Sequence, residues 1–226
     1  KPRGRLPVPV NYSNLGVALL GFIVAQQLGG AYEATLVERL CDPLGLRDTR
    51  ITLTADQQKR LAAPHTANGK PGHSWDLPAF AGAGALRSTA NDLLKFLAAN
   101  MANMGQPQSS VTDALLACHN THTHTFAPAG RLQKLLSGLS RTGQTPAAYR
   151  QGMALGWAVG RLVSGETQIH WHHGATGAYR AFAGFTKSTG NGVVVLANTG
   201  LGLADALRNS TSTDALGFEV LERLNS

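Results

Sequence analysis

Apolar residues recur at helical spacing from Asn14 onward, and this pattern predicts the first helix of the chain. Gly29 and Gly30 end the pattern, because glycine disfavours a helix interior. The apolar run 15–25 is too short to span a bilayer, so we expect a buried helix and no membrane span. The positions that follow i, i+4, i+7 and i+8 spacing are Leu15, Leu19, Phe22 and Ile23.

Turn signals divide the next part of the chain. A second helix is expected over about 31–40, ending before Asp42-Pro43-Leu44-Gly45. Residues 47–86 are rich in turn signals, such as Asn68-Gly69, Pro71-Gly72 and Asp76-Leu77-Pro78, so we expect a long excursion with little regular structure.

Capping residues mark two more helices. Ser88 or Thr89 begins a helix with its apolar face at 93–97, and Asp92 stands in the acidic place of a capping box. Another helix is expected over 111–118. The polar segment 119–145 has no clear assignment.

After about residue 150 the period of the pattern changes from helical to alternating. Val193–Leu196 is apolar on both faces, which predicts a central strand covered on both sides. Short glycine-containing turns between the segments favour an antiparallel meander, and an amphipathic helix over about 213–224 should cover one face of it. The expected strands are Met153–Val163, Thr167–His172, Tyr179–Thr186 and Gly192–Asn198.

These elements predict an α+β fold in two parts. Residues 1–150 form a mainly helical region, and residues 151–226 form an antiparallel sheet with a C-terminal helix. The length of 226 residues, 43% hydrophobic content and 15% charged content fit a compact chain with a sizeable core and argue against disorder.

The net charge of +7 does not predict nucleic-acid binding. Basic residues are mostly scattered singly, and the one cluster, Lys1, Arg3 and Arg5, lies among prolines without interleaved aromatic residues. Cys41 and Cys118 lie too far apart in sequence for a zinc signature and are either buried thiols or one disulfide.

A histidine cluster follows Cys118, with His119, His122 and His124 at short spacing. Such a cluster can bind zinc, but a polar surface loop is the favoured interpretation, so we expect no metal and no cofactor.

Two segments carry residues suited to catalysis. Tyr12 stands just before a helix N-terminus, where a phenolate would be stabilised by backbone N–H groups; alternatively, it is a packing tyrosine at a helix entry. Trp171-His172-His173-Gly174-Ala175 ends a predicted strand. Gly174 and Ala175 would let a substrate lie against the backbone, where an N–H can face an oxyanion. The alternative interpretation of this segment is a histidine-rich turn.

Together these segments resemble the serine β-lactamase and penicillin-binding protein superfamily, in particular its class C-like branch of class C β-lactamases, D,D-peptidases and β-lactamase-like esterases. Tyr12-Ser13-Asn14 resembles the Tyr-x-Asn motif, and His172-His173-Gly174 the His-x-Gly form of the strand motif. Supporting segments occur in the family's order: Asp42–Leu46, Gly84–Leu93, Leu155-Gly156-Trp157 and Gly174–Gly177.

The resemblance implies a role for each matching residue. Tyr12 would be the general base, and Asn14 would bind the motif lysine and the substrate amide. His172 would help to hold the phenolate and meet the substrate carboxylate, with His173 and Gly174 lining the same edge. The N–H of Ala175 would be one of two oxyanion donors.

The family's Ser-x-x-Lys motif, which carries the nucleophile, is missing from all 226 residues. The eleven residues before Tyr12 have no room for it. We therefore expect that a front segment is absent or exists as a separate piece, and that exposed apolar surface favours a partner chain or self-association.

The resemblance implies a serine hydrolase that forms and hydrolyses an acyl-enzyme with a small-molecule substrate: a β-lactam, a D-amino-acid peptide or an ester. Without its nucleophile we expect little or no turnover from the chain alone. The alternative is a non-catalytic relative that binds ligands or partners. The compartment is undetermined by the residues; the family tends to be periplasmic or secreted.

Overall fold

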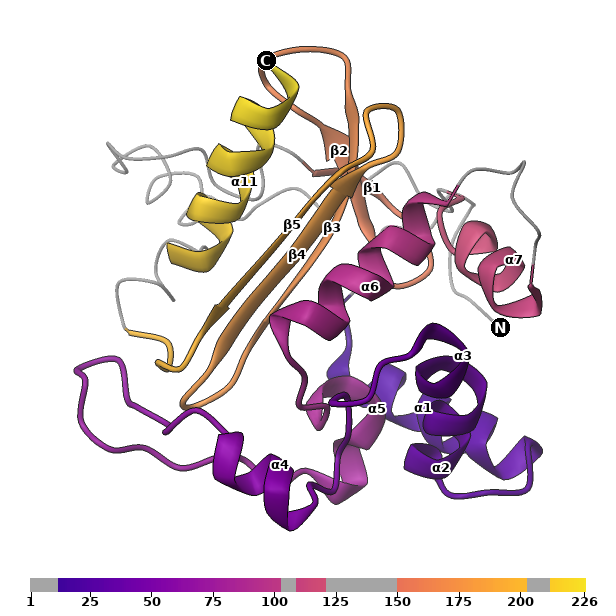
Figure 1. The fold of residues 1–226 in the computed structure, drawn as a ribbon, viewed down its shortest axis with the longest axis vertical. Helices are drawn as coiled ribbons and strands as arrows, with labels where there is room; N and C mark the ends of the chain where they lie inside the picture. Colours follow the sequence, from indigo (N-terminus) through magenta and orange to yellow (C-terminus); the bar gives the residue numbers. More distant parts are fainter. Residues whose placement is uncertain (1–11, 103–108, 121–149, 203–211) are drawn as a thin grey trace, which may run out of the picture.

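The structure is a computed structural model, and it describes residues 12–102, 109–120, 150–202 and 212–226. Helices precede an antiparallel sheet in the chain, and a C-terminal helix follows it (Figure 1). The helical region extends from α1 to α7, strands β1–β5 follow it, and α11 closes the chain. This confirms the α+β prediction.

The sheet is a five-stranded antiparallel meander in the order β1-β2-β3-β4-β5. The expected single strand over 153–163 is instead two strands, because the chain turns between Ala154 and Trp157 with Gly156 at φ 80°. The remaining strands lie close to their predicted positions. Their bounds are β1 Arg150–Met153, β2 Ala158–Arg161, β3 Gln168–Ala175, β4 Arg180–Thr186 and β5 Asn191–Ala197.

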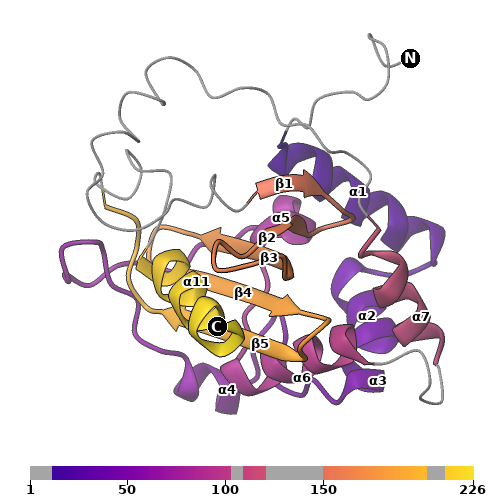
Figure 2. The same cartoon turned by 90° about the horizontal axis from the view of Figure 1, so that it is seen from above.

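Helices cover both faces of the sheet (Figure 2). On one face α11, Ser212–Asn225, packs Phe218 and Leu221 against Trp171 and Phe182. On the other face α6, Ala90–Met101, contributes Leu97 to a second cluster with Trp157 and Phe185. The sheet is thus the middle layer of three.

The prediction that β5 is covered on both faces is confirmed, but among the described strands β5 lies at the end of the sheet and not at its centre. Its continuous apolar sequence has another cause. Val193 packs into the cluster under α11, whereas Val194 packs on the opposite face against the cluster that includes Leu97 of α6. Two covering helices, rather than two neighbouring strands, require apolar residues on both faces of β5.

The second predicted helix continues further than expected, through α2 Tyr32–Leu36, a π-helical turn η1 Val37–Cys41 and α3 Asp42–Leu44. Pro43 lies in the last turn of this stretch, and the helix ends one residue later, at Leu44. Gly45, at φ 65°, ends the helix in left-handed conformation.

The excursion 47–86 holds three short helical segments that the turn signals did not predict. The first begins with a capping box, in which Thr54 accepts from the N–H of Gln57 and the Gln57 side chain accepts from the N–H of Thr54. The segments are α4 Ala55–Arg60, the 3₁₀ turn η2 Pro78–Phe80 and α5 Ala81–Gly84.

The two helices predicted from capping residues are confirmed. Thr89 caps α6 by accepting from the N–H of Asp92, and Ser109 caps α7, Ser110–Ala117. Cys41 and Cys118 are both free thiols. Most of the unassigned segment 119–145 lies outside the described residues.

Helix α1, Asn14–Gln27, is not the buried helix expected. Only Ala18 and Ala25 are buried, because α1 packs through small residues: a side chain on Gly21 would meet the Tyr32 ring and the backbone of Gly82 in α5. The apolar residues of α1 are distributed over all sides of the helix, so most of its large side chains are exposed. The exposed set is Leu15, Val17, Leu19, Leu20, Phe22, Ile23 and Val24.

Among the described residues, no single helix is long and apolar enough to cross a membrane. Helix α1 and the stretch Tyr32–Leu44 pass that test of length and composition only as a pair bent by 80°.

Candidate active site

The N-terminus of α1 presents the Tyr-x-Asn triplet. Ser13, not Asn14, is the N-cap, and its hydroxyl accepts from the N–H of Gly16 at 3.0 Å. This cap starts the helix at Asn14 and places Tyr12 just outside the first turn. The Tyr12 side chain is 63% exposed, so its hydroxyl is accessible.

The C-terminal half of β3 presents the His-x-Gly segment. Strand β2 pairs with β3 only as far as Trp171, so His172–Ala175 pairs with β4 alone among the described strands. One edge of this stretch therefore borders no described strand. Successive side chains alternate between faces: His172 shares a face with His170, and His173 shares the opposite face with Trp171.

The two predicted motifs converge in space. The Tyr12 and His172 rings lie with their centroids 6.4 Å apart and their planes inclined by 32°. Tyr12 comes from the helical region and His172 from the sheet, although 160 positions separate them in the chain. The structure therefore brings a phenol and an imidazole to one place, beside the part of β3 whose second edge borders no described strand.

His173 has a partner that the sequence did not reveal. Its Nδ1 lies 3.1 Å from Oδ2 of Asp214 in the first turn of α11, and the Asp214 side chain is fully buried. An acidic residue in a first helical turn is common at surface helices, so sequence alone carried no signal for this pair. The bond ties the end of β3 to the helix that covers the sheet.

Three segments meet just beyond Ala175. The N–H of Thr176 donates to the carbonyl of Tyr179 at 2.9 Å, which closes the turn between β3 and β4. Gly200, after β5, lies so close to Gly177 that a Cβ at position 200 would fall 2.1 Å from the Gly177 carbonyl oxygen. The backbone carbonyl of His65 accepts from the N–H of Gly200, and this bond joins the excursion 47–86 to this end of the sheet.

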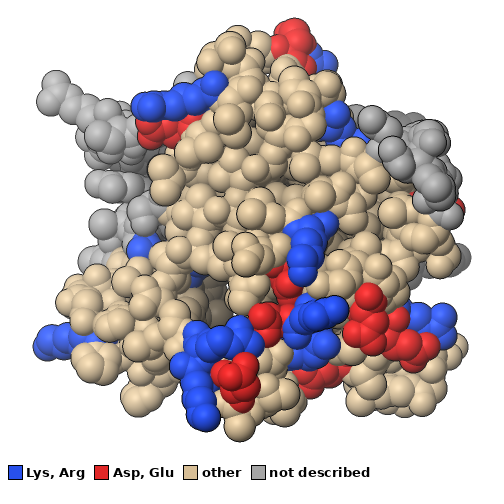
Figure 3. Space-filling view, in the orientation of Figure 1, with Lys and Arg blue, Asp and Glu red and all other residues tan. Residues whose placement is uncertain are grey.

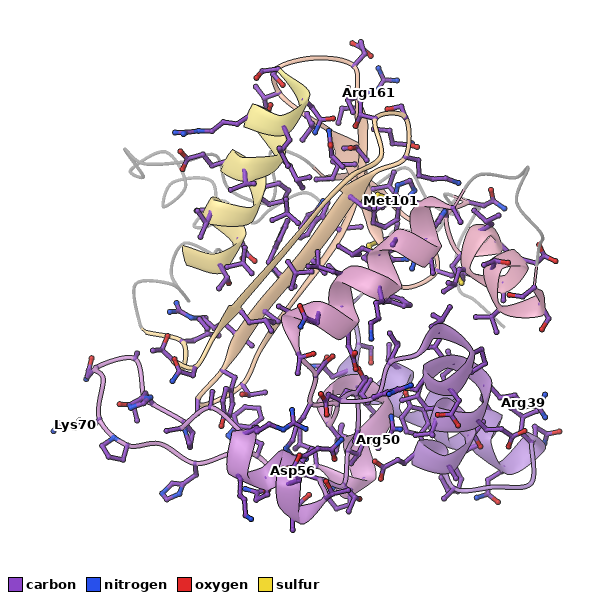
Figure 4. All side chains as sticks on the ribbon, viewed as in Figure 1. Arg39, Arg50, Asp56, Lys70, Met101 and Arg161 are labelled. Carbon is purple, nitrogen blue, oxygen red and sulfur yellow. The ribbon has the colours of Figure 1, made fainter. Side chains whose placement is uncertain are left out.

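The loop that follows His65 carries Lys70 and lies at the same end of the sheet (Figure 4). Positive and negative side chains are interspersed over the visible face, without a stripe of one sign (Figure 3).

The histidine cluster after Cys118 is only partly described, since His122 and His124 lie outside the described residues. His119 is buried, and its Nε2 lies 2.8 Å from Oδ1 of Asn100. Within the part of the chain that the structure describes, no group of three or more His, Cys, Asp or Glu side chains is arranged to hold a metal ion.

Comparison with known proteins gives the family. The Beta-lactamase family model matches residues 8–217. The chain belongs to the Beta-lactamase family. A Pseudomonas fluorescens protein named Beta-lactamase is 25% identical over 197 residues, covering 83% of this chain and 54% of that protein. A human protein named Putative beta-lactamase-like 1 is 37% identical over 90 residues, covering 39% of this chain and 18% of that protein.

Solved structures show the same fold. A class C beta-lactamase aligns with a TM-score of 0.67 and 22% identity, covering 97% of this chain and 59% of its own. A beta-lactamase/D-alanine carboxypeptidase from Yersinia pestis, complexed with citrate, aligns with a TM-score of 0.68 and 20% identity, covering 97% and 56%. The fold is thus class C β-lactamase-like, and the chain spans about half the length of the Pseudomonas fluorescens relative and little more of these two structures.

Proposed function

We propose that this chain provides the base and the substrate-binding strand of a serine hydrolase of the class C β-lactamase-like type. Its substrate is a β-lactam, a D-amino-acid peptide or an ester, and the reaction proceeds through an acyl-enzyme. Family membership supports the reaction class. The observation that carries the assignment of residues is the approach of the Tyr12 and His172 rings to 6.4 Å.

In this proposal Tyr12 accepts the proton of the nucleophilic serine as that serine attacks the substrate carbonyl. His172 stabilises the phenolate, and Asn14, on the first turn of α1, binds the substrate amide. The Tyr12 hydroxyl then donates this proton to the leaving group. A water molecule completes the cycle by hydrolysing the acyl-enzyme ester, which frees the serine.

The strand supplies the second half of the site. His172–Ala175 borders no described strand on one side, so a substrate can lie along this edge. The Ala175 N–H serves as one oxyanion donor, and Gly174, which has no side chain, leaves room for the substrate backbone. The second oxyanion donor belongs to the serine that bears the acyl group.

That serine lies outside these 226 residues, because no Ser-x-x-Lys occurs among them. We propose that a polypeptide segment bearing Ser-x-x-Lys completes the site, either within a longer protein or as a separate chain. The exposed apolar residues of α1 offer the surface on which such a segment packs.

Benzylpenicillin binding tests the assignment of residues. Tyr12→Phe and His172→Ala should each weaken noncovalent binding about 3- to 10-fold, as expected for the loss of one hydrogen bond. Arg39→Ala is the control, since Arg39 lies on the outer side of the helical region (Figure 4). Unchanged affinity in both site variants, measured by calorimetry, contradicts the proposal.

Acylation tests the origin of the nucleophile. Incubation of the chain alone with a fluorescent penicillin should leave its intact mass unchanged. Co-expression with a Ser-x-x-Lys-bearing segment of a class C β-lactamase should give an adduct on the serine of that segment, and Tyr12→Phe should slow its formation. A stable adduct on the chain alone would show that it contains its own nucleophile.

The absence of Ser-x-x-Lys also favours a second candidate, a non-catalytic relative that binds ligands or partners through the same Tyr12–His172 site. It predicts penicillin binding that depends on Tyr12 and His172, with no acylation even when the serine-bearing segment forms a stable complex with the chain.

A further inference from the structure

Trp75 stands apart from the other two tryptophans. The side chains of Trp157 and Trp171 are buried in the two cores, at 7% and 1% exposure, whereas Trp75 is 52% exposed. It lies on the excursion 47–86, outside both hydrophobic clusters. A half-exposed indole offers an apolar aromatic face that a ligand can contact.

The ring of Trp75 lies against the turn that follows the proposed oxyanion donor. A Cβ at position 177 would fall 2.6 Å from the indole Nε1, so the indole lies directly over Gly177 and depends on the absence of a side chain there. Gly177 is two residues after Ala175. The indole therefore lies at the substrate end of β3.

Polar contacts hold the Trp75 segment on both sides. The Ser74 hydroxyl donates to the Tyr179 hydroxyl at 3.3 Å, and the Tyr179 hydroxyl donates to the carbonyl of Ala62 at 2.7 Å. The guanidinium of Arg87 donates to the Trp75 carbonyl at 3.3 Å. These bonds fix the backbone of Trp75 and its neighbour Ser74, and they leave the indole ring half-exposed.

The segment then leads to the other half of the site. After Trp75 the chain forms η2 and α5, both of which pack against α1, the helix that begins beside Tyr12. Residues 75–84 thus connect the turn after β3 to α1, and these two elements carry the two proposed halves of the site.

We propose that Trp75 is a specificity-determining residue whose indole packs against an aromatic or bulky apolar acyl group of the substrate. This inference rests on the proposed function, since it requires a substrate carbonyl near Ala175. An offset-stacked or edge-to-face aromatic contact favours a substrate that carries an aryl group over the same substrate without one.

Two ligands that share one ring system test the proposal: benzylpenicillin, which carries a phenylacetyl group, and 6-aminopenicillanic acid, which lacks it. Trp75→Ala should weaken benzylpenicillin binding about 3- to 10-fold, the worth of an aromatic pair, and leave 6-aminopenicillanic acid binding unchanged. Leu155→Ala, an exposed apolar position in the turn between β1 and β2, is the matched control. Melting temperatures check that both variants fold.

Tryptophan fluorescence gives a second measurement. Because the other two tryptophans are buried, acrylamide should quench mainly Trp75. Saturating benzylpenicillin should protect the fluorescence of Trp75 from quenching by acrylamide, whereas 6-aminopenicillanic acid should not. Trp75→Phe should abolish the quenchable fraction.

The outcomes separate this inference from the proposed function. If Trp75→Ala lowers the affinity for both ligands equally, or for neither, the role of Trp75 is overturned. The proposed Tyr12–His172 site is unaffected by that result. Failure of the wild-type chain to bind either ligand overturns both.

Discussion

At the scale of single residues, two buried histidines lie side by side inside the protein. His119 and His170 lie with ring centroids 5.0 Å apart, and both rings contact Phe185. Burial, the neighbouring His170 and Lys187 lower the pKa of His119 to about 4. Burial also lowers the pKa of His170. Burial thus disfavours the charged form of both imidazoles.

This pair predicts acid sensitivity. The pKa of His119 is about 4 in the folded state against an ordinary value of 6.5, so its contribution to stability is complete above pH 6.5 and is lost as pH falls from 6.5 towards 4. The full shift corresponds to roughly 3 kcal/mol. Urea unfolding of the wild type at pH 7.5, 5.5 and 4 should show this loss.

His119→Gln serves as the comparison, because glutamine keeps a hydrogen-bonding group near Asn100 and does not titrate. Its stability should fall less steeply between pH 6.5 and 4 than that of the wild type. Equal slopes in the two proteins would assign the acid sensitivity to other groups, such as the carboxylates.

At the scale of elements, the sheet is held between two helices that differ in how closely they approach it. Helix α11 comes closest at Gly217, where a Cβ would lie 2.2 Å from the Phe182 ring on β4. Helix α6 meets the opposite face through Leu97, near Phe185. The bond between His173 and Asp214 adds a polar tie at the N-terminal end of α11.

Gly217→Ala should destabilise the protein by about 1–3 kcal/mol, the usual cost of overpacking a core, even though alanine favours a helix. Gly165→Ala is the control, because nothing lies within 4 Å of a Cβ there and its φ is not positive. Thermal or urea unfolding of both variants measures the difference. Equal stability of the two would contradict the close approach of α11.

Much of the element order was predictable from sequence, for physical reasons that also explain the errors. The helix cap at Thr89 and the alternating apolar residues of the strands between 167 and 197 are local signals, so the sequence pattern identified them. Two expectations failed because tertiary contacts decided them: α1 packs through Ala18 and Gly21 rather than through its large residues, and β5 owes its apolar faces to two helices. Gly156 divided one expected strand into two.

The candidate site was predictable only in part. Tyr12 and His172 were found through motifs, and the structure brings their rings together. Asp214 and Trp75 were not found, because a buried carboxylate and an exposed indole look ordinary in a one-dimensional pattern. The catalytic roles of Tyr12, Asn14, His172, His173, Gly174 and Ala175 stay predictions, as does the division of the chain at residue 150.

At the scale of the whole molecule, α1 carries the largest run of exposed apolar side chains in one described helix, including Leu15, Leu19 and Phe22. It contacts α2, η2 and α5, whereas strong helix–sheet contacts belong to α6 and α11. An exposed apolar surface of this kind promotes association, as expected from sequence.

We predict that the isolated chain self-associates at micromolar concentration. The double variant Leu19→Gln and Phe22→Gln should shift it towards monomer in light scattering after gel filtration, with little change in melting temperature, because both side chains are exposed. A sharp monomer peak for the wild type at every concentration would contradict this prediction.

The meeting of Gly200 with Gly177 limits which sequences this protein can adopt. With only 2.1 Å between a Cβ at position 200 and a carbonyl oxygen, even alanine forces two backbones apart, and one of them supports the indole of Trp75. In a library that samples all twenty amino acids at position 200, selection for folded protein should return glycine alone, whereas Gly165 should accept many replacements.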